Sequence, residues 1–140
     1  MALKVSQLKV GDTHVERVVE NLTRTEIVMY CGVSGDYNPL HADEVYVTQK
    51  AGYPTVFAHG MLTMGLTGKM LTNYVGDGRL TKFGVRFTNQ VWPGDTLDTT
   101  ITVEGLRHEG GQNLADLKVV TTNQDGKEVV SGSATARIDP

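Results

Sequence analysis

The sequence predicts a single α+β domain in which a curved antiparallel sheet of about five strands wraps around one long central helix. Two observations predict this fold. The segment from Gly60 to Tyr74 is apolar on every side, as expected of a buried helix. The chain after residue 78 consists of long runs rich in Val, Thr, Phe and Leu that turn residues separate. Because helical segments precede the strands instead of alternating with them, the pattern favours α+β over βαβ units.

The first half of the chain is expected to hold one strand and two short helices. In chain order these are a strand from Thr13 to Val19, a helix from Ile27 to Tyr30 and a helix from about Asp43 to Lys50. Thr23 and Glu26 have the spacing of a capping box, which begins the first helix, and Gly32 is expected to end it. Dense turn residues from Ser34 to Pro39 separate the two helices.

The second half is expected to hold the central helix and four strands. The strands are predicted at about Arg79 to Gln90, Thr96 to Arg107, Leu114 to Asn123 and Glu128 to Arg137. Gly65 and Gly68 each cost about 1 kcal/mol relative to Ala inside a helix, so we expect another backbone to approach closely there. A sheet around one helix leaves its edges open, and we therefore expect a homodimer that joins two sheets edge to edge.

Composition excludes several classes of function. The 140 residues fit one domain, residues 1–140. The formal charge of −3 argues against nucleic acid or a membrane surface as a partner. No apolar run reaches the ~18–20 residues of a membrane span, and no signal peptide begins the chain, so we expect a cytoplasmic protein. The single cysteine, Cys31, suits a reducing compartment.

Metal and nucleotide motifs are not found in the sequence. The four histidines, His14, His41, His59 and His108, have no spacing typical of a zinc site, and we expect no metal. Neither the dinucleotide fingerprint nor the phosphate-binding loop motif is complete.

Asp36 and His41 are the candidate general acid and base. They lie in one tight loop, Ser34-Gly35-Asp36-Tyr37-Asn38-Pro39-Leu40-His41, in which Pro39 restricts the backbone and Gly35 permits sharp curvature. The two side chains can therefore converge on one water, as general acid/base chemistry requires. The alternative is that these residues only satisfy turn backbone groups and that His41 begins the next helix.

Gly60 is the candidate binding residue for an oxyanion. The segment Ala58-His59-Gly60-Met61 leads directly into the central helix, so the Gly60 amide lies at a helix N-terminus. Donors of this kind stabilise charge that develops on a carbonyl oxygen. The alternative is an ordinary helix start, with His59 capping the helix or packing against it.

These two segments resemble a known family. Tyr30-Cys31-Gly32-Val33-Ser34-Gly35-Asp36-Tyr37-Asn38-Pro39-Leu40-His41 resembles the hydratase motif of MaoC-like, (R)-specific enoyl-CoA hydratases, and Ala58-His59-Gly60-Met61 resembles the start of their central helix. The clear motifs span roughly Thr23 to Gly68. The resemblance implies a hot-dog fold, in which a curved sheet wraps a long helix and two chains form a continuous double sheet.

The resemblance also implies roles for individual residues. Asp36 and His41 would hold and activate a water that adds to C3 of a trans-2-enoyl thioester while C2 receives a proton, or catalyse the reverse dehydration. Gly60 would donate to the thioester oxygen, and Ser34 and Asn38 would support the loop. No separate cofactor is implied, because the substrate carries coenzyme A or the pantetheine arm of an acyl carrier protein.

Three narrower or competing interpretations stay open. The same motifs are similar to the catalytic B subunit of the heterodimeric (3R)-hydroxyacyl-ACP dehydratase of mycolic-acid-type fatty acid elongation, which implies a second, non-catalytic hot-dog chain as partner. A hot-dog thioesterase would use Asp36 to direct water at the carbonyl carbon. A non-catalytic acyl-thioester-binding subunit would keep only the fold, and the presence of both Asp36 and His41 argues against it.

Overall fold

The computed structural model describes residues 3–140. Its elements are η1 (Val5–Gln7), β1 (Thr13–Val19), α1 (Arg24–Ser34), α2 (Pro39–Ala42), α3 (Glu44–Gln49), α4 (Gly60–Val75), β2 (Leu80–Phe87), β3 (Leu97–Glu109), β4 (Gln112–Thr122) and β5 (Glu128–Ile138). The five strands form one sheet in the order β1-β3-β4-β5-β2, and every neighbouring pair is antiparallel. The predicted α+β fold with five strands around one long helix is confirmed.

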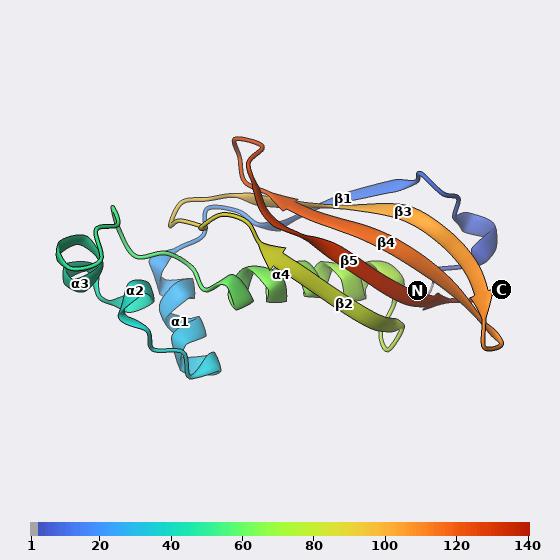
Figure 1. Cartoon of the computed structure of the whole chain (residues 1–140), viewed down its shortest axis with the longest axis horizontal. Coiled ribbons are helices and arrows are strands. Elements are labelled where there is room, and N and C mark those ends of the chain that lie inside the picture. The colour runs from blue at the N-terminus through green and yellow to red at the C-terminus, as the bar shows by residue number, and fades with distance from the viewer. Residues whose placement is uncertain (1–2) are drawn as a thin grey trace.

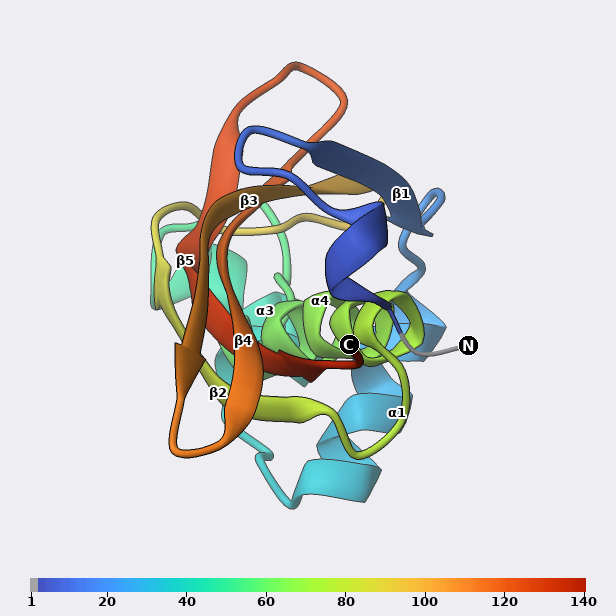
Figure 2. The same cartoon turned by 90° about the vertical axis from the view of Figure 1, so that its right-hand side faces the viewer.

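The sheet curves around α4, as the view along the helix shows (Figure 2). Leu71 and Val75 of α4 are completely buried and belong to one core cluster with Ile101, Leu117 and other inward-facing residues of the sheet. A second cluster at the other end includes Leu22 and Ile27 beside Val91, Leu97 and Val129. It joins the α1 end of the molecule to the sheet.

The helices α1, α2 and α3 lie beyond the N-terminal end of α4 and outside the curve of the sheet (Figure 1). α1 is longer than predicted, because the chain stays helical through Gly32 and leaves the helix only at Gly35, which adopts the left-handed conformation with φ of 74°. β2 is shorter than predicted: it ends at Phe87, and residues 88–90 leave the sheet. None of the described helices is both long and apolar enough to cross a membrane.

The expectation that α4 is buried on every side is wrong for the single chain. Met61, Gly65 and Lys69 form an exposed stripe along the helix, and Met61 is 54% exposed. A Cβ on Gly65 would meet nothing within 4 Å, and one on Gly68 would face the Phe83 ring at 3.3 Å instead of a backbone. The predicted close backbone approach is therefore wrong at both glycines, because the sheet covers only part of the helix surface.

A close backbone contact does occur between the edge strand β2 and its neighbour β5. Gly132 pairs with Val85 across the two strands. A Cβ on Gly132 would collide with the carbonyl oxygen of Gly84 and lie 2.7 Å from the Cα of Val85. Backbone atoms cannot rotate away as a side chain can, so the position of β2 depends on glycine at residue 132.

We therefore expect Gly132→Ala to lower the free energy of unfolding by about 1–3 kcal/mol, the usual cost of inserting atoms into a packed site. Gly84→Ala is the matched control on the paired strand, because its Cβ would have no neighbour within 4 Å. Urea unfolding of both variants measures the difference. Equal unfolding midpoints for the two variants would contradict the close contact.

Candidate active site

The loop that carries Asp36 is held by short-range hydrogen bonds. The Ser34 hydroxyl donates to the Tyr30 carbonyl at 2.6 Å and accepts from the Asp36 amide at 3.1 Å. The Asn38 amide donates to Asp36 Oδ1 at 3.2 Å, and Asn38 Oδ1 accepts from the Leu40 amide at 3.0 Å. Ser34 and Asn38, both predicted to support the loop, thus bond its backbone, and Oδ2 of Asp36 stays outside these bonds.

His41 presents one ring nitrogen to that carboxylate. Its Nδ1 lies 2.6 Å from the carbonyl oxygen of Phe57. A carbonyl oxygen can only accept, so Nδ1 carries the proton and Nε2 of the neutral ring keeps its lone pair. His41 Nε2 lies 4.0 Å from Asp36 Oδ2, which is too long for a direct hydrogen bond.

The gap between the two groups has the size of one water. A water that hydrogen-bonds both atoms at about 2.8 Å would hold them roughly 4–4.6 Å apart, depending on the angle at its oxygen. The His41 side chain is largely buried and the Asp36 side chain is 52% exposed, so such a water can be reached from solvent. The structure thus brings together the two residues that the sequence paired.

His59 completes the cluster, although sequence reasoning gave it no role in the site. Its ring stacks on His41, with ring centres 3.8 Å apart and planes 26° from parallel. Its Nε2 lies 3.1 Å from the carbonyl oxygen of Asp36 and 3.5 Å from Cys31 Sγ. The signal that could have revealed it is its position directly before Gly60, in the segment that begins the central helix.

The surroundings of His59 favour its neutral form. Its side chain is buried, and Nδ1 has no hydrogen-bond partner among the described residues. Burial, as the largest effect, lowers the pKa of His59, and the positive charge of a protonated His41 lowers it further. The Asp36 carbonyl opposes this shift without reversing it.

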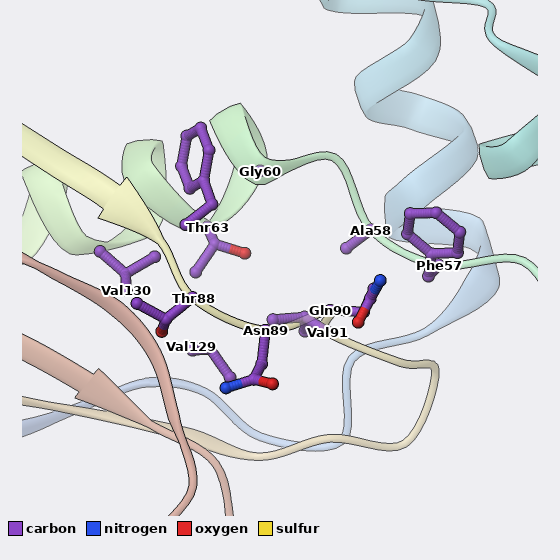
Figure 3. A pocket seen from close by; sticks show the side chains of 11 residues that line it. Phe57, Ala58, Gly60, Thr63, Thr88, Asn89, Gln90, Val91, Val129 and Val130 are labelled. Atoms are coloured by element: carbon purple, nitrogen blue, oxygen red, sulfur yellow. The ribbon is translucent and has the colours of Figure 1, made fainter.

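Gly60 is the first residue of α4, and its amide has no hydrogen-bond partner in the described part of the chain. The residue borders a cavity of about 260 Å³. A Cβ at this position would lie 2.9 Å from the ring of Phe87, so only glycine leaves the space open. The cavity is lined by Phe57, Ala58, Gly60, Thr63, Phe87, Thr88, Asn89, Gln90, Val91, Val129 and Val130 (Figure 3).

Asp36 and His41 do not line this cavity. The segment from Phe57 to Gly60 connects the two places: Phe57 holds His41 through its carbonyl and lines the cavity with its side chain. His59 stacks on His41, and Gly60 follows it directly in the chain. The predicted site residues are therefore joined through one short extended segment.

Asp36, His41 and His59 also offer ligand atoms that all lie within 4.8 Å of one another, which is a spacing a metal ion could use. Metal ligands must point their lone pairs at one centre about 2.0–2.2 Å away. The lone pairs of stacked imidazoles lie in nearly parallel planes and cannot converge in this way. The geometry suits a water between Asp36 and His41 better than an ion.

Comparison with known families shows that the chain belongs to one of them. Residues 6–129 match the family model described as MaoC like domain, and the chain belongs to this family. The chain is 32% identical over 123 residues to the (R)-specific enoyl-CoA hydratase of Rhodospirillum rubrum, covering 86% of this chain and 83% of that protein. It is 39% identical over 120 residues to 3-hydroxyacyl-thioester dehydratase Y of Mycobacterium tuberculosis, covering 84% of this chain and 39% of that protein.

Solved structures confirm the hot-dog fold that the resemblance implied. The unliganded R-hydratase PhaJ1 of Pseudomonas aeruginosa superposes with a TM-score of 0.83 at 26% identity, covering 99% of this chain and 86% of that one. A chain of the ChsH1-ChsH2 complex of M. tuberculosis has the same fold, with a TM-score of 0.77 at 20% identity, covering 93% of this chain and 98% of that one. The chain spans about two fifths of the mycobacterial dehydratase, so it corresponds to a part of that longer protein.

The lowered pKa of His59 makes a prediction about stability and pH. In the unfolded chain His59 takes up a proton near its ordinary pKa of 6.5, whereas the folded protein takes it up only at lower pH. The stabilisation that the neutral His59 gives to the folded protein is therefore fully present above about pH 6.5, and it is lost as the pH falls through the folded-state pKa. We expect the melting temperature to fall between about pH 7 and pH 5, and His59→Phe to remove part of that fall.

Thermal denaturation across this range measures the effect. The titratable groups that contact or face His59 are Asp36, His41, Cys31 and Tyr30. Asp116, whose pKa the neighbouring Arg107 lowers, contributes only at more acidic pH. An identical pH dependence in the wild-type protein and His59→Phe would show that His59 is not the group responsible.

Proposed function

We propose that this protein is an (R)-specific enoyl-thioester hydratase that also catalyses the reverse dehydration of (3R)-hydroxyacyl thioesters. The observation that carries the proposal is the water-sized gap of 4.0 Å between Asp36 Oδ2 and His41 Nε2. Gly60, whose amide has no hydrogen-bond partner among the described residues, directly follows His59, which stacks on His41. Relatives named as an (R)-specific enoyl-CoA hydratase and a 3-hydroxyacyl-thioester dehydratase support it.

The pair would activate the water from two sides. Asp36 Oδ2 accepts one hydrogen bond and orients the water, and the lone pair of His41 Nε2 accepts the proton that the water loses. The oxygen then bonds to C3 of the enoyl group, and the electron pair of the double bond moves toward the thioester carbonyl. The protonated His41 then gives that proton from Nε2 to C2, so the addition of water balances without an external acid and His41 returns to its neutral form.

Gly60 would stabilise the charge that this step creates. Negative charge grows on the thioester oxygen as the enolate forms, and an amide at a helix N-terminus provides a donor and a favourable dipole. Loss of one such donor costs about 2.7–4 kcal/mol in enzymes that use them. The role fits glycine, because a side chain at residue 60 would meet the Phe87 ring.

The substrate would bring its own carrier, either coenzyme A or an acyl carrier protein, and no further cofactor is required for this chemistry. The apolar side chains of Val91, Val129 and Val130 line the cavity beside Gly60 and suit an acyl group. At about 260 Å³ the cavity is smaller than most ligand pockets, which span ~300–1,000 Å³, so it fits a short acyl segment. A cytoplasmic location agrees with the lone reduced cysteine, Cys31.

We also propose that the working unit is a dimer joined along the β2 edge. β2 is a terminal strand of the sheet, so one side of its backbone has no partner strand in this chain. Met61 and Phe87, both more than half exposed, lie beside the predicted site at the start of α4 and the end of β2. A second copy would cover both, and a different hot-dog chain is the alternative partner.

Catalysis by the pair predicts that Asp36→Asn and His41→Ala each lower the rate of crotonyl-CoA hydration by about 10²- to 10⁴-fold while the fold persists. The loss of conjugated-enoyl absorbance measures the rate, and circular dichroism checks the fold. Asp43→Asn is the control, because Asp43 caps α3 and asparagine caps helices equally well.

Three outcomes would count against this assignment. Wild-type rates in both variants would exclude the pair as the catalytic groups. Free thiol released from a saturated acyl-CoA would favour the thioesterase interpretation. Calorimetric binding of acyl-CoA with no turnover of any enoyl or hydroxyacyl thioester would indicate a binding subunit.

The dimer predicts a mass of twice 15.2 kDa in size-exclusion chromatography with light scattering. Met61→Glu places a charge in the expected contact and should shift the protein toward the monomer. Val10→Glu is the control, because Val10 is also more than half exposed and precedes β1, which lies at the opposite end of the strand order from β2. A monomeric wild-type protein would instead favour a different hot-dog chain as the partner.

A further inference from the structure

We propose that His59 is a positioning residue that sets the gap between Asp36 and His41. Its N–H holds the main chain of Asp36, and its ring face holds the plane of His41. The inference deepens the proposed function, since it concerns the same site. Its structural claims can nevertheless be measured without any assay of catalysis.

The first contact anchors the catalytic loop to the rest of the molecule. The side chain and the amide of Asp36 bond only to neighbours within the loop, Asn38 and Ser34. The carbonyl of Asp36, in contrast, accepts from His59 Nε2, which lies 23 residues further along the chain. Because a carbonyl can only accept, His59 is the tautomer protonated at Nε2. This bond therefore fixes where the Asp36 carboxylate stands relative to α4.

The second contact fixes the orientation of the His41 ring. Among the described residues, the His41 ring has a single hydrogen bond, from Nδ1 to the Phe57 carbonyl, and one bond leaves a ring free to turn about the direction of that bond. The His59 ring lies against one face at 3.8 Å, and the edge-on Phe57 ring lies 5.4 Å away. These neighbours restrict the rotation and direct Nε2 toward Asp36 Oδ2.

Packing alone does not explain an imidazole at this position. His59 Nδ1 is a buried acceptor without a partner among the described residues, and such a group is destabilising. A phenyl ring would occupy nearly the same space, keep the stacking and remove the unpaired nitrogen. What the imidazole adds is the N–H that reaches Asp36.

His59 positions the pair and takes no proton itself. A proton on Nδ1 would be buried without an acceptor, and it would place a second positive charge against His41 when that ring holds the proton taken from water. A neutral neighbour leaves His41 as the ring that can change its charge during the reaction.

Two substitutions separate the N–H from the ring. His59→Phe keeps an aromatic face and loses the donor, whereas His59→Gln loses the ring and keeps an amide N–H that can reach the Asp36 carbonyl. His14→Phe is the matched control. His14 also stacks on a ring, that of Tyr74 at 4.6 Å, and lies on β1 away from the site.

We expect His59→Phe to lower kcat for crotonyl-CoA hydration by about 10- to 100-fold, the effect of a small misplacement of catalytic groups. KM should stay within about twofold of the wild-type value, because His59 does not line the cavity beside Gly60 that would hold the acyl group. The melting temperature should not fall. His59→Gln should retain more of kcat than His59→Phe, and His14→Phe should match the wild type. Full activity in His59→Phe, or a larger loss in His59→Gln, would overturn the inference and leave His59 a packing residue.

Nitrogen-15 spectra of the histidine rings test the same inference independently of activity. The wild type should show His59 as the neutral Nε2–H tautomer and His41 as the neutral Nδ1–H tautomer. In His59→Gln, which removes the stacked ring, the Nδ1 proton of His41 should exchange faster with water than in the wild type, whereas His59→Phe, which keeps an aromatic face, should leave it nearly unchanged. His59 protonated at Nδ1, or an unchanged exchange rate in His59→Gln, would overturn the inference. A wild-type protein without turnover of any thioester would overturn the proposed function alone, and these spectra would still decide the placement of His41.

Discussion

The packing of α4 into the concave face of the sheet is the constraint on which the site depends. Leu71 and Val75 are completely buried against the strands and fix the helix along its length. The start of the helix is thereby held at Gly60 beside Phe87, at the end of the edge strand. β2 is held there by its antiparallel pairing with β5, which includes the close backbone contact at Gly132. The same two strands thus contribute Phe87, Val129 and Val130 to the cavity beside Gly60.

Two backbone carbonyls determine which ring nitrogen carries the proton in each of the two stacked histidines. The Phe57 carbonyl requires a proton on His41 Nδ1, and the Asp36 carbonyl requires one on His59 Nε2. One imidazole therefore presents a bare nitrogen toward the carboxylate, while the stacked one is buried and neutral. Two histidines thus have different surroundings and, in the proposed mechanism, one would act as the base and the other would support it. Asp36 Oδ2 and His41 Nε2 would then both accept hydrogen bonds from one water.

The single chain leaves part of its own structure uncovered. The sheet ends at β2 with an unpaired backbone edge, and the stripe from Met61 to Lys69 faces away from the sheet. Both features lie next to the site, so a partner chain that covers them would also limit the access of solvent to the acyl group. The proposed dimer would therefore cover the open side of the fold, where the candidate site lies.

The sequence by itself determined the parts of this protein that short-range chemistry controls. Thr23 and Glu26 cap α1, and the loop bonds of Ser34 and Asn38 bring Asp36 and His41 together within a few residues. The sequence pattern predicts the end of α1 near Gly32, three residues before Gly35, where the structure ends the helix. Only the tertiary structure decided the stack of His59 on His41, the contact at Gly132 and the exposed side of α4. Each of these depends on which segments the fold brings together from distant parts of the sequence, and no local pattern of residue types encodes such contacts.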